Sequence, residues 1–137
     1  MNANQLFLAL GALLLLMIVT TTLNRTYILA LTETIDNQLR FEAVNFAQSL
    51  TELVFSASEE YDQIDALLAN RDDIQDPNKR FTRVTQFGDS LFATITLTPD
   101  TTLQHGVTGR LAAIQVYSRQ NGTFVAEAET RATINRR

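Results

Sequence analysis

The first part of the chain has an apolar pattern that changes, without a break, into a helical stripe. From Leu6 to Leu23 no side chain is charged. At 1.5 Å per residue, a helix of about 18 residues is about 27 Å long, which is enough to cross the hydrocarbon core of a bilayer. Such a segment is not stable alone in water, so it must enter a membrane, pack against copies of itself, or be removed by cleavage.

Beyond Leu23, apolar residues recur every three or four positions, as on one face of an amphipathic helix. They are Ile28, Leu31, Ile35, Leu39, Ala43, Phe46, Leu50, Leu53 and Ala57. Between Ala12 and Phe87 the only proline or glycine is Pro77. We therefore predict one helix from about Asn4 to about Phe55, with a length of about 75–80 Å.

The rest of the chain predicts a short second helix and then strands. The short helix carries Tyr61, Ile64, Leu67 and Leu68, and residues 70–79 form a loop by composition. From Arg80 the apolar period becomes two, which predicts strands at 81–86, 91–97, 111–118 and 123–132, the last two joined by an Asn121-Gly122 hairpin turn. We expect residues 133–137 to form a frayed tail.

These elements predict an α+β fold with two parts. Residues 1–57 form a long N-terminal helix, of which 1–23 are a membrane or filament-core segment. Residues 58–137 form a small head that packs on the second half of the helix through an antiparallel sheet of about four strands. The chain has 137 residues, which suits one small domain besides the apolar segment.

Charge and composition exclude several classes of function. The net charge is −4, with no cysteine and a single histidine, His105. The chain has no basic stripe, so nucleic acid is not a predicted partner. Disulfides and thiolate metal sites are excluded, and we predict no cofactor. Asp72, Asp73 and Asp76 lack calcium-loop spacing and are interpreted as a solvated loop, and His105 as a surface residue. We therefore predict that the chain is not an enzyme.

The start of the chain does not match a secretory signal. Residues 1–5 contain no Lys or Arg, and no Ala-x-Ala cleavage pattern follows the apolar run. Because Arg25 follows the run, the positive-inside rule favours a cytoplasmic C-terminal part. The alternative is that a basic leader preceded Met1 and was removed. Both alternatives stay open.

Gln5 lies at the start of the apolar run. If its side chain is buried among apolar neighbours it needs a hydrogen-bond partner, such as the α-amino group of an adjacent chain. If it lies in the headgroup region, it needs none.

Asn121-Gly122-Thr123 also matches the N-glycosylation pattern, although the turn alone explains these residues.

In organisation the chain resembles a type IV pilin or pseudopilin. The resemblance rests on the apolar run 6–23, the amphipathic stretch 28–57 and the strands within 81–132. It covers the whole length but not the motifs: Met1 and Gln5 stand where the family usually has Phe and Glu, and the C-terminal cysteine pair is absent.

The resemblance implies a structural subunit of a bacterial surface filament. Its expected partners are copies of itself, the inner membrane before assembly and the pilus assembly machinery. The expected location is the cell-surface filament with an inner-membrane pool. The expected assembly residues are Met1, Gln5, Leu6, Phe7, Leu10, Leu14, Leu15 and Ile18. The alternative is a single-pass anchored accessory protein of an envelope or secretion complex that does not polymerise.

Overall fold

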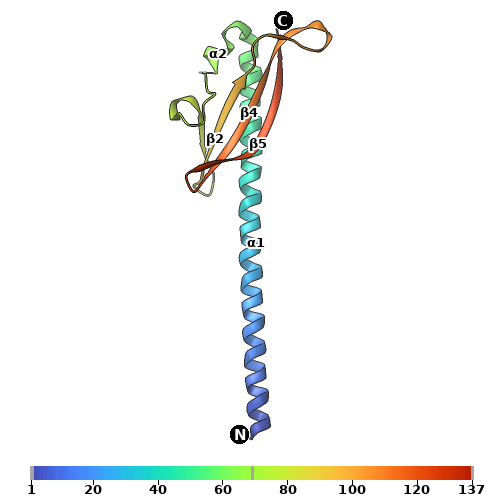
Figure 1. Cartoon of the computed structure of the whole chain (residues 1–137), viewed down its shortest axis with the longest axis vertical. Helices are drawn as coiled ribbons and strands as arrows, with labels where there is room; N and C mark the ends of the chain where they lie inside the picture. The colour runs from blue at the N-terminus through green and yellow to red at the C-terminus, as the bar shows by residue number, and fades with distance from the viewer. Residues whose placement is uncertain (1, 69, 137) are drawn as a thin grey trace. The chain divides into compact units, whose positions relative to one another are not determined.

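The structure is a computed structural model that describes residues 2–68 and 70–136. The chain divides into two compact units, Met1–Gln38 and Leu39–Arg137. The division falls within the first helix, so the second half of that helix belongs to the head unit. The predicted α+β class is confirmed: a long N-terminal helix is followed by a small antiparallel sheet on which its second half packs (Figure 1).

Helix α1 spans Ala3–Ala57, close to the predicted bounds. The three consecutive threonines Thr20, Thr21 and Thr22 do not interrupt it. The Thr21 hydroxyl donates to the Met17 carbonyl at 2.8 Å, and the Thr22 hydroxyl donates to the Ile18 carbonyl at 2.9 Å. This back-bonding satisfies the hydroxyl within its own helix, which is how threonine is tolerated among apolar residues.

Within the head unit, α1 buries one face against the sheet. Apart from the adjacent pair Phe46 and Ala47, successive buried positions are three or four residues apart: Ala43, Phe46, Ala47, Leu50, Val54 and Ala57. Three of these six residues are small alanines. Sheet residues complete the core: Leu91, Ala93, Ile95, Ala112, Ile114, Val116, Ala132 and Ile134.

The predicted short second helix is mostly a 3-10 segment. η1 spans Ser58–Gln63 and contains Glu60 in a non-helical conformation, and a single α turn, α2, follows at Ile64–Leu67. Of its apolar residues, Ile64 and Leu68 are buried, whereas Leu67 is exposed. A third short segment, η2 at Pro77–Lys79, lies in the predicted loop.

The sheet has five strands, one more than predicted. They are β1 (Phe81–Val84), β2 (Ser90–Leu97), β3 (Thr101–Thr102), β4 (Thr108–Gln120) and β5 (Thr123–Asn135). β2 pairs with β1 and with β4, and β4 also pairs with β3 and β5, always antiparallel. The extra strand has only two residues and lies between the predicted second and third strands; a 3-10 turn, η3 (Gln104–Gly106), connects it to β4.

The last strand is longer than predicted and contains a bulge. Residues 133–135 are not a frayed tail: β5 continues to Asn135, and Ile134 is 1% exposed. A bulge between Val116 and Tyr117 also breaks the simple alternation of β5, since Ala128 pairs with Val116 while Ala126 pairs with Tyr117. Ala128 therefore packs against the core instead of sharing a face with Ala126.

The predicted hairpin at Asn121-Gly122 is confirmed. It joins β4 to β5, with Gln120 paired to Thr123. Both turn residues have positive φ, 50° at Asn121 and 80° at Gly122. Two successive residues with positive φ give the turn that matches the right-handed twist of the two strands.

Candidate functional site

The expected assembly residues lie along the first half of α1. All described residues from 2 to 37 are exposed, including the apolar ones. Six of the eight expected residues are large, exposed hydrophobic side chains: Leu6, Phe7, Leu10, Leu14, Leu15 and Ile18. Gln5 is exposed as well, and Met1 lies outside the described residues. These side chains therefore have no buried environment within the described part of their own chain.

Length and composition allow this helix to cross a membrane. The apolar window near its N-terminus contains no residue that is buried in the chain. This distinguishes it from the core helix of a soluble domain, whose apolar residues are covered by the same chain. A signal sequence near an N-terminus passes the same test of length and hydropathy, so these two properties do not give the destination of the segment.

Gln5 takes part in a capping box that sequence reasoning missed. The side-chain oxygen of Asn2 accepts a hydrogen bond from the Gln5 backbone N–H at 2.9 Å. In return, Gln5 Oε1 accepts from the Asn2 backbone N–H at 3.4 Å. An Asn followed three residues later by Gln is a sequence signal for this cap. The Gln5 side chain thus has a hydrogen-bond partner within its own helix. This is a third possibility besides the α-amino group of an adjacent chain and the headgroup region.

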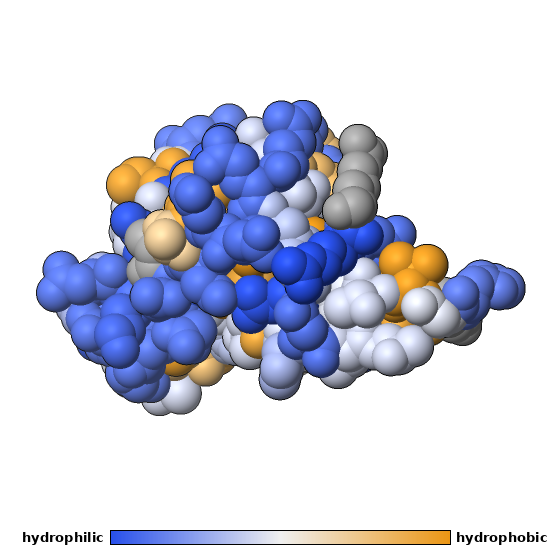
Figure 2. All heavy atoms as spheres, turned by 90° about the horizontal axis from the view of Figure 1, so that it is seen from above, coloured by the Kyte–Doolittle hydropathy of each residue, from blue (hydrophilic) through white to orange (hydrophobic). Residues whose placement is uncertain are grey.

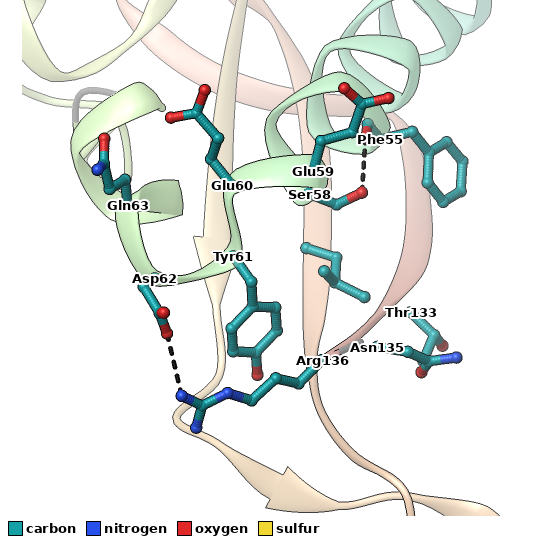
Figure 3. A pocket seen from close by; sticks show the side chains of 11 residues that line it. Phe55, Ser58, Glu59, Glu60, Tyr61, Asp62, Gln63, Thr133, Asn135 and Arg136 are labelled. Carbon is teal, nitrogen blue, oxygen red and sulfur yellow. Dashed lines mark hydrogen bonds and ion pairs between the residues drawn. The ribbon is translucent and has the colours of Figure 1, made fainter.

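The head carries an open hollow of about 890 Å³ where the end of α1, η1 and the end of β5 meet (Figure 3). Arg136 forms an ion pair with Asp62 at 3.3 Å, and its guanidinium lies 5.8 Å from the Tyr61 ring centre. Glu59 and Glu60 also line the hollow but point away from Arg136 (Figure 3). The acidic groups therefore do not converge on one point.

Tyr61 connects this hollow to the turn after β2. Its hydroxyl donates to the carboxylate of Asp100. Partial burial raises the pKa of Tyr61 above its ordinary value of 10.0, and the hydrogen bond and negative charge of Asp100 raise it further. The phenol is therefore held in its neutral form, in which it donates this hydrogen bond.

Arg110 fastens the segment after α1 to the sheet. Its two terminal nitrogens contact the carboxylate of Asp65 at 3.0 and 3.1 Å, and Nε donates to the Thr98 carbonyl at 2.6 Å. The hydrogen bonds to Asp65 raise the pKa of Arg110. Both partners are used in holding the fold, so Asp65 is a structural carboxylate.

Two of the three acidic loop residues, Asp73 and Asp76, serve local turns. Asp73 accepts from the Gln75 backbone N–H, and Asp76 caps η2 by accepting from the Asn78 backbone N–H, both at 2.9 Å. Among the described residues, no group of three or more His, Asp or Glu side chains is placed to hold a metal ion. His105 is exposed, with φ of 66° in a turn.

The face of the molecule drawn in Figure 2 is mostly hydrophilic, with scattered apolar residues. The largest set of exposed hydrophobic side chains in the described residues is instead on α1, from Leu6 to Ile35. This apolar segment is the candidate functional site. Comparison of the chain with protein-family models, with curated proteins and with solved structures gave no match.

Proposed function

We propose that the chain is a structural subunit of a bacterial surface filament similar to a type IV pilus, and that it polymerises through its apolar N-terminal helix. One observation carries this proposal. The residues from Leu6 to Leu23 are apolar and exposed, whereas one face of the same helix beyond Leu39 is buried in the head. The second half of the helix therefore has its packing partners within its own chain, whereas the apolar segment requires partners from outside it.

Burial of the segment supplies the driving force for assembly. At about 25 cal/mol per Å² of apolar area, burying the surface of an 18-residue apolar helix is worth tens of kcal/mol before entropy costs. In the inner membrane, lipid chains cover the segment. In the filament, neighbouring copies cover it, and the pilus assembly machinery transfers the subunit between the two. The heads then lie outside the bundled helices, at the cell surface.

Negative-stain electron microscopy of material sheared from the cell surface, with N-terminal sequencing of this chain, tests the proposal. We expect thin filaments that contain the chain. Absence of filaments, with the chain confined to membranes, would contradict polymerisation. It would favour a single-pass anchored accessory protein of an envelope or secretion complex.

A further inference from the structure

The first unit contains three charged side chains among its apolar residues: Arg25, Glu33 and Asp36. All three are exposed, and no described residue forms a salt bridge with any of them. Their spacing separates them into two groups. Asp36 has Arg40 four residues later, the arrangement in which an acid and a base attract along a helix.

Arg25 and Glu33 have no such neighbour. The residues three and four positions from Arg25 are Thr21, Thr22, Ile28 and Leu29. Those around Glu33 are Leu29, Ala30, Asp36 and Asn37, of which the single charged one repels it. Eight residues separate the two, so they do not meet along one straight helix. Each is a charge that its own helix leaves without an opposite partner.

Their surroundings make a partner necessary in a bundle. Tyr27, Ile28, Leu29 and Leu31 lie between the two charges and are exposed in the chain. If copies bury these side chains against one another, the two charges are withdrawn from water as well. An unpaired charge in such a place is strongly destabilising, whereas a hydrogen-bonded pair is tolerated.

We propose that Arg25 of one copy pairs with Glu33 of a neighbouring copy in the filament; this rests on the function proposed above. Copies that leave the same membrane have the same orientation, so their helices are parallel. Pairing then requires a shift of eight residues, about 12 Å along the helix axis. The planar guanidinium binds both oxygens of a carboxylate, which fixes this axial register better than apolar contacts do.

The pairing is head-to-tail. Each copy contributes Arg25 to one neighbour and Glu33 to another, so the contact does not close on itself. A contact of this kind generates an open helical polymer rather than a dimer. It selects one register among the many that an apolar surface of leucines would accept.

Charge reversal in the full-length chain tests the pairing, with filaments counted in material sheared from cells. We expect Arg25→Glu and Glu33→Arg each to lower the filament yield about tenfold or more, because each leaves two like charges in the buried register. The double variant restores the pair and is expected to recover at least about half of the yield. Asp36→Asn is the matched control and keeps most filaments.

Co-expression of the two single variants adds a second readout. The glutamate introduced by Arg25→Glu in one chain then meets the arginine introduced by Glu33→Arg in the other. The unchanged Arg25 of the second chain meets the unchanged Glu33 of the first. We expect filaments that contain both chains in equal amounts. Immunoblots of the membrane fraction separate a failure of assembly from a failure of insertion.

Cross-linking tests whether position 25 of one copy lies close to position 33 of a neighbouring copy. The chain has no cysteine, so Arg25→Cys/Glu33→Cys carries the only thiols. A short bis-maleimide reagent is expected to produce a ladder of linked subunits in filaments of this variant, or in mixed filaments with the unmodified chain. Arg25→Cys/Asp36→Cys is the control and gives a weaker ladder.

The outcomes separate the two proposals. If the unmodified chain forms no filaments, both are wrong. If it forms filaments and either single reversal assembles normally, the Arg25–Glu33 pairing is wrong and the filament function stands. A double reversal that is as defective as the single ones, without a ladder in the cysteine variant, also contradicts the pairing.

Discussion

The segments Leu6–Leu23 and Leu39–Ala57 belong to one helix, yet only the second has partners in its own chain. Val54 is fully buried in the head, whereas Leu14, an equally apolar side chain, is 62% exposed. The difference shows that apolar content alone does not place a helix in a core. The second segment has one apolar face, which packs on the sheet, and one polar face. The first segment is apolar on all sides and fits an environment that surrounds it.

The strongest test of this difference is a charge in the first segment. We expect Leu14→Asp to abolish filaments, because a carboxylate at the centre of an apolar helix costs about 3 kcal/mol in each copy. The head should stay folded, since no head residue depends on Leu14. Electron microscopy measures assembly, and resistance of the strands to proteolysis measures folding.

Leu14→Ile is the matched control for this experiment and is expected to assemble. Normal filaments from the aspartate variant would show that the first segment is not buried between copies. Loss of the folded head in the same variant would instead show that the two segments are not independent.

A cavity in the head should lower the stability of the head, which the substitutions in the first segment leave unchanged. Ile114 is fully buried among α1 and the sheet, so we expect Ile114→Ala to lower the free energy of unfolding of the head by about 2–5 kcal/mol. Leu15→Ala removes similar apolar volume from the first segment and should leave head stability unchanged. Because the chain has no tryptophan, urea unfolding of the detergent-solubilised full chain can be followed by tyrosine fluorescence. Equal destabilisation by both variants would contradict the difference between the exposed first segment of α1 and the buried head.

A smaller loss of head stability is expected from a substitution at the start of β4. At Gly109 a methyl group would overlap the backbone carbonyl of Ile134 and the Leu103 side chain. We expect Gly109→Ala to destabilise the head by about 1–3 kcal/mol, because the overlap is with backbone and the paired strands must shift. Gly11→Ala is the control: nothing lies near an added methyl group there, and in a helix it is expected to be neutral or slightly stabilising. The same urea measurement distinguishes them.

Local chemistry explains which features could be predicted from the sequence. The spacing of Phe46 and Leu50 predicts a buried helix face, and Asn121-Gly122 predicts a hairpin, because each signal lies within a few residues. On the same predicted stripe, however, Leu53 is 40% exposed, and its neighbour Val54, which the stripe did not include, is buried instead. The Asn2–Gln5 cap was equally local and was missed, although its three-residue spacing is a known signal.

Features that depend on distant residues could not be predicted. Ile134 is buried because β4 continues far enough to pair with it, and nothing near position 134 indicates that length. The bulge at Val116 depends on the register of two strands. The contact between Arg110 and Asp65 joins positions 45 residues apart. For the candidate site the position followed from the apolar run, whereas the pairing of Arg25 and Glu33 lies between copies and stays a proposal.

The smallest expected effect concerns the alkaline stability of the head. Because the pKa of Tyr61 is raised in the folded chain, its neutral form stabilises the head at pH values below the ordinary value of 10.0. This contribution is lost as the pH rises through the folded-state pKa, since the folded head binds the proton more tightly than the unfolded chain does. We therefore expect the unfolding midpoint to fall more steeply above about pH 10 in the unmodified chain than in Tyr61→Phe. Tyr27→Phe, on the exposed first half of α1, should keep the steeper fall. Equal slopes for all three chains would show that the contact between Tyr61 and Asp100 does not contribute to holding η1 on the sheet, and the ion pair between Asp62 and Arg136 would then be the polar contact that ties η1 to the end of β5.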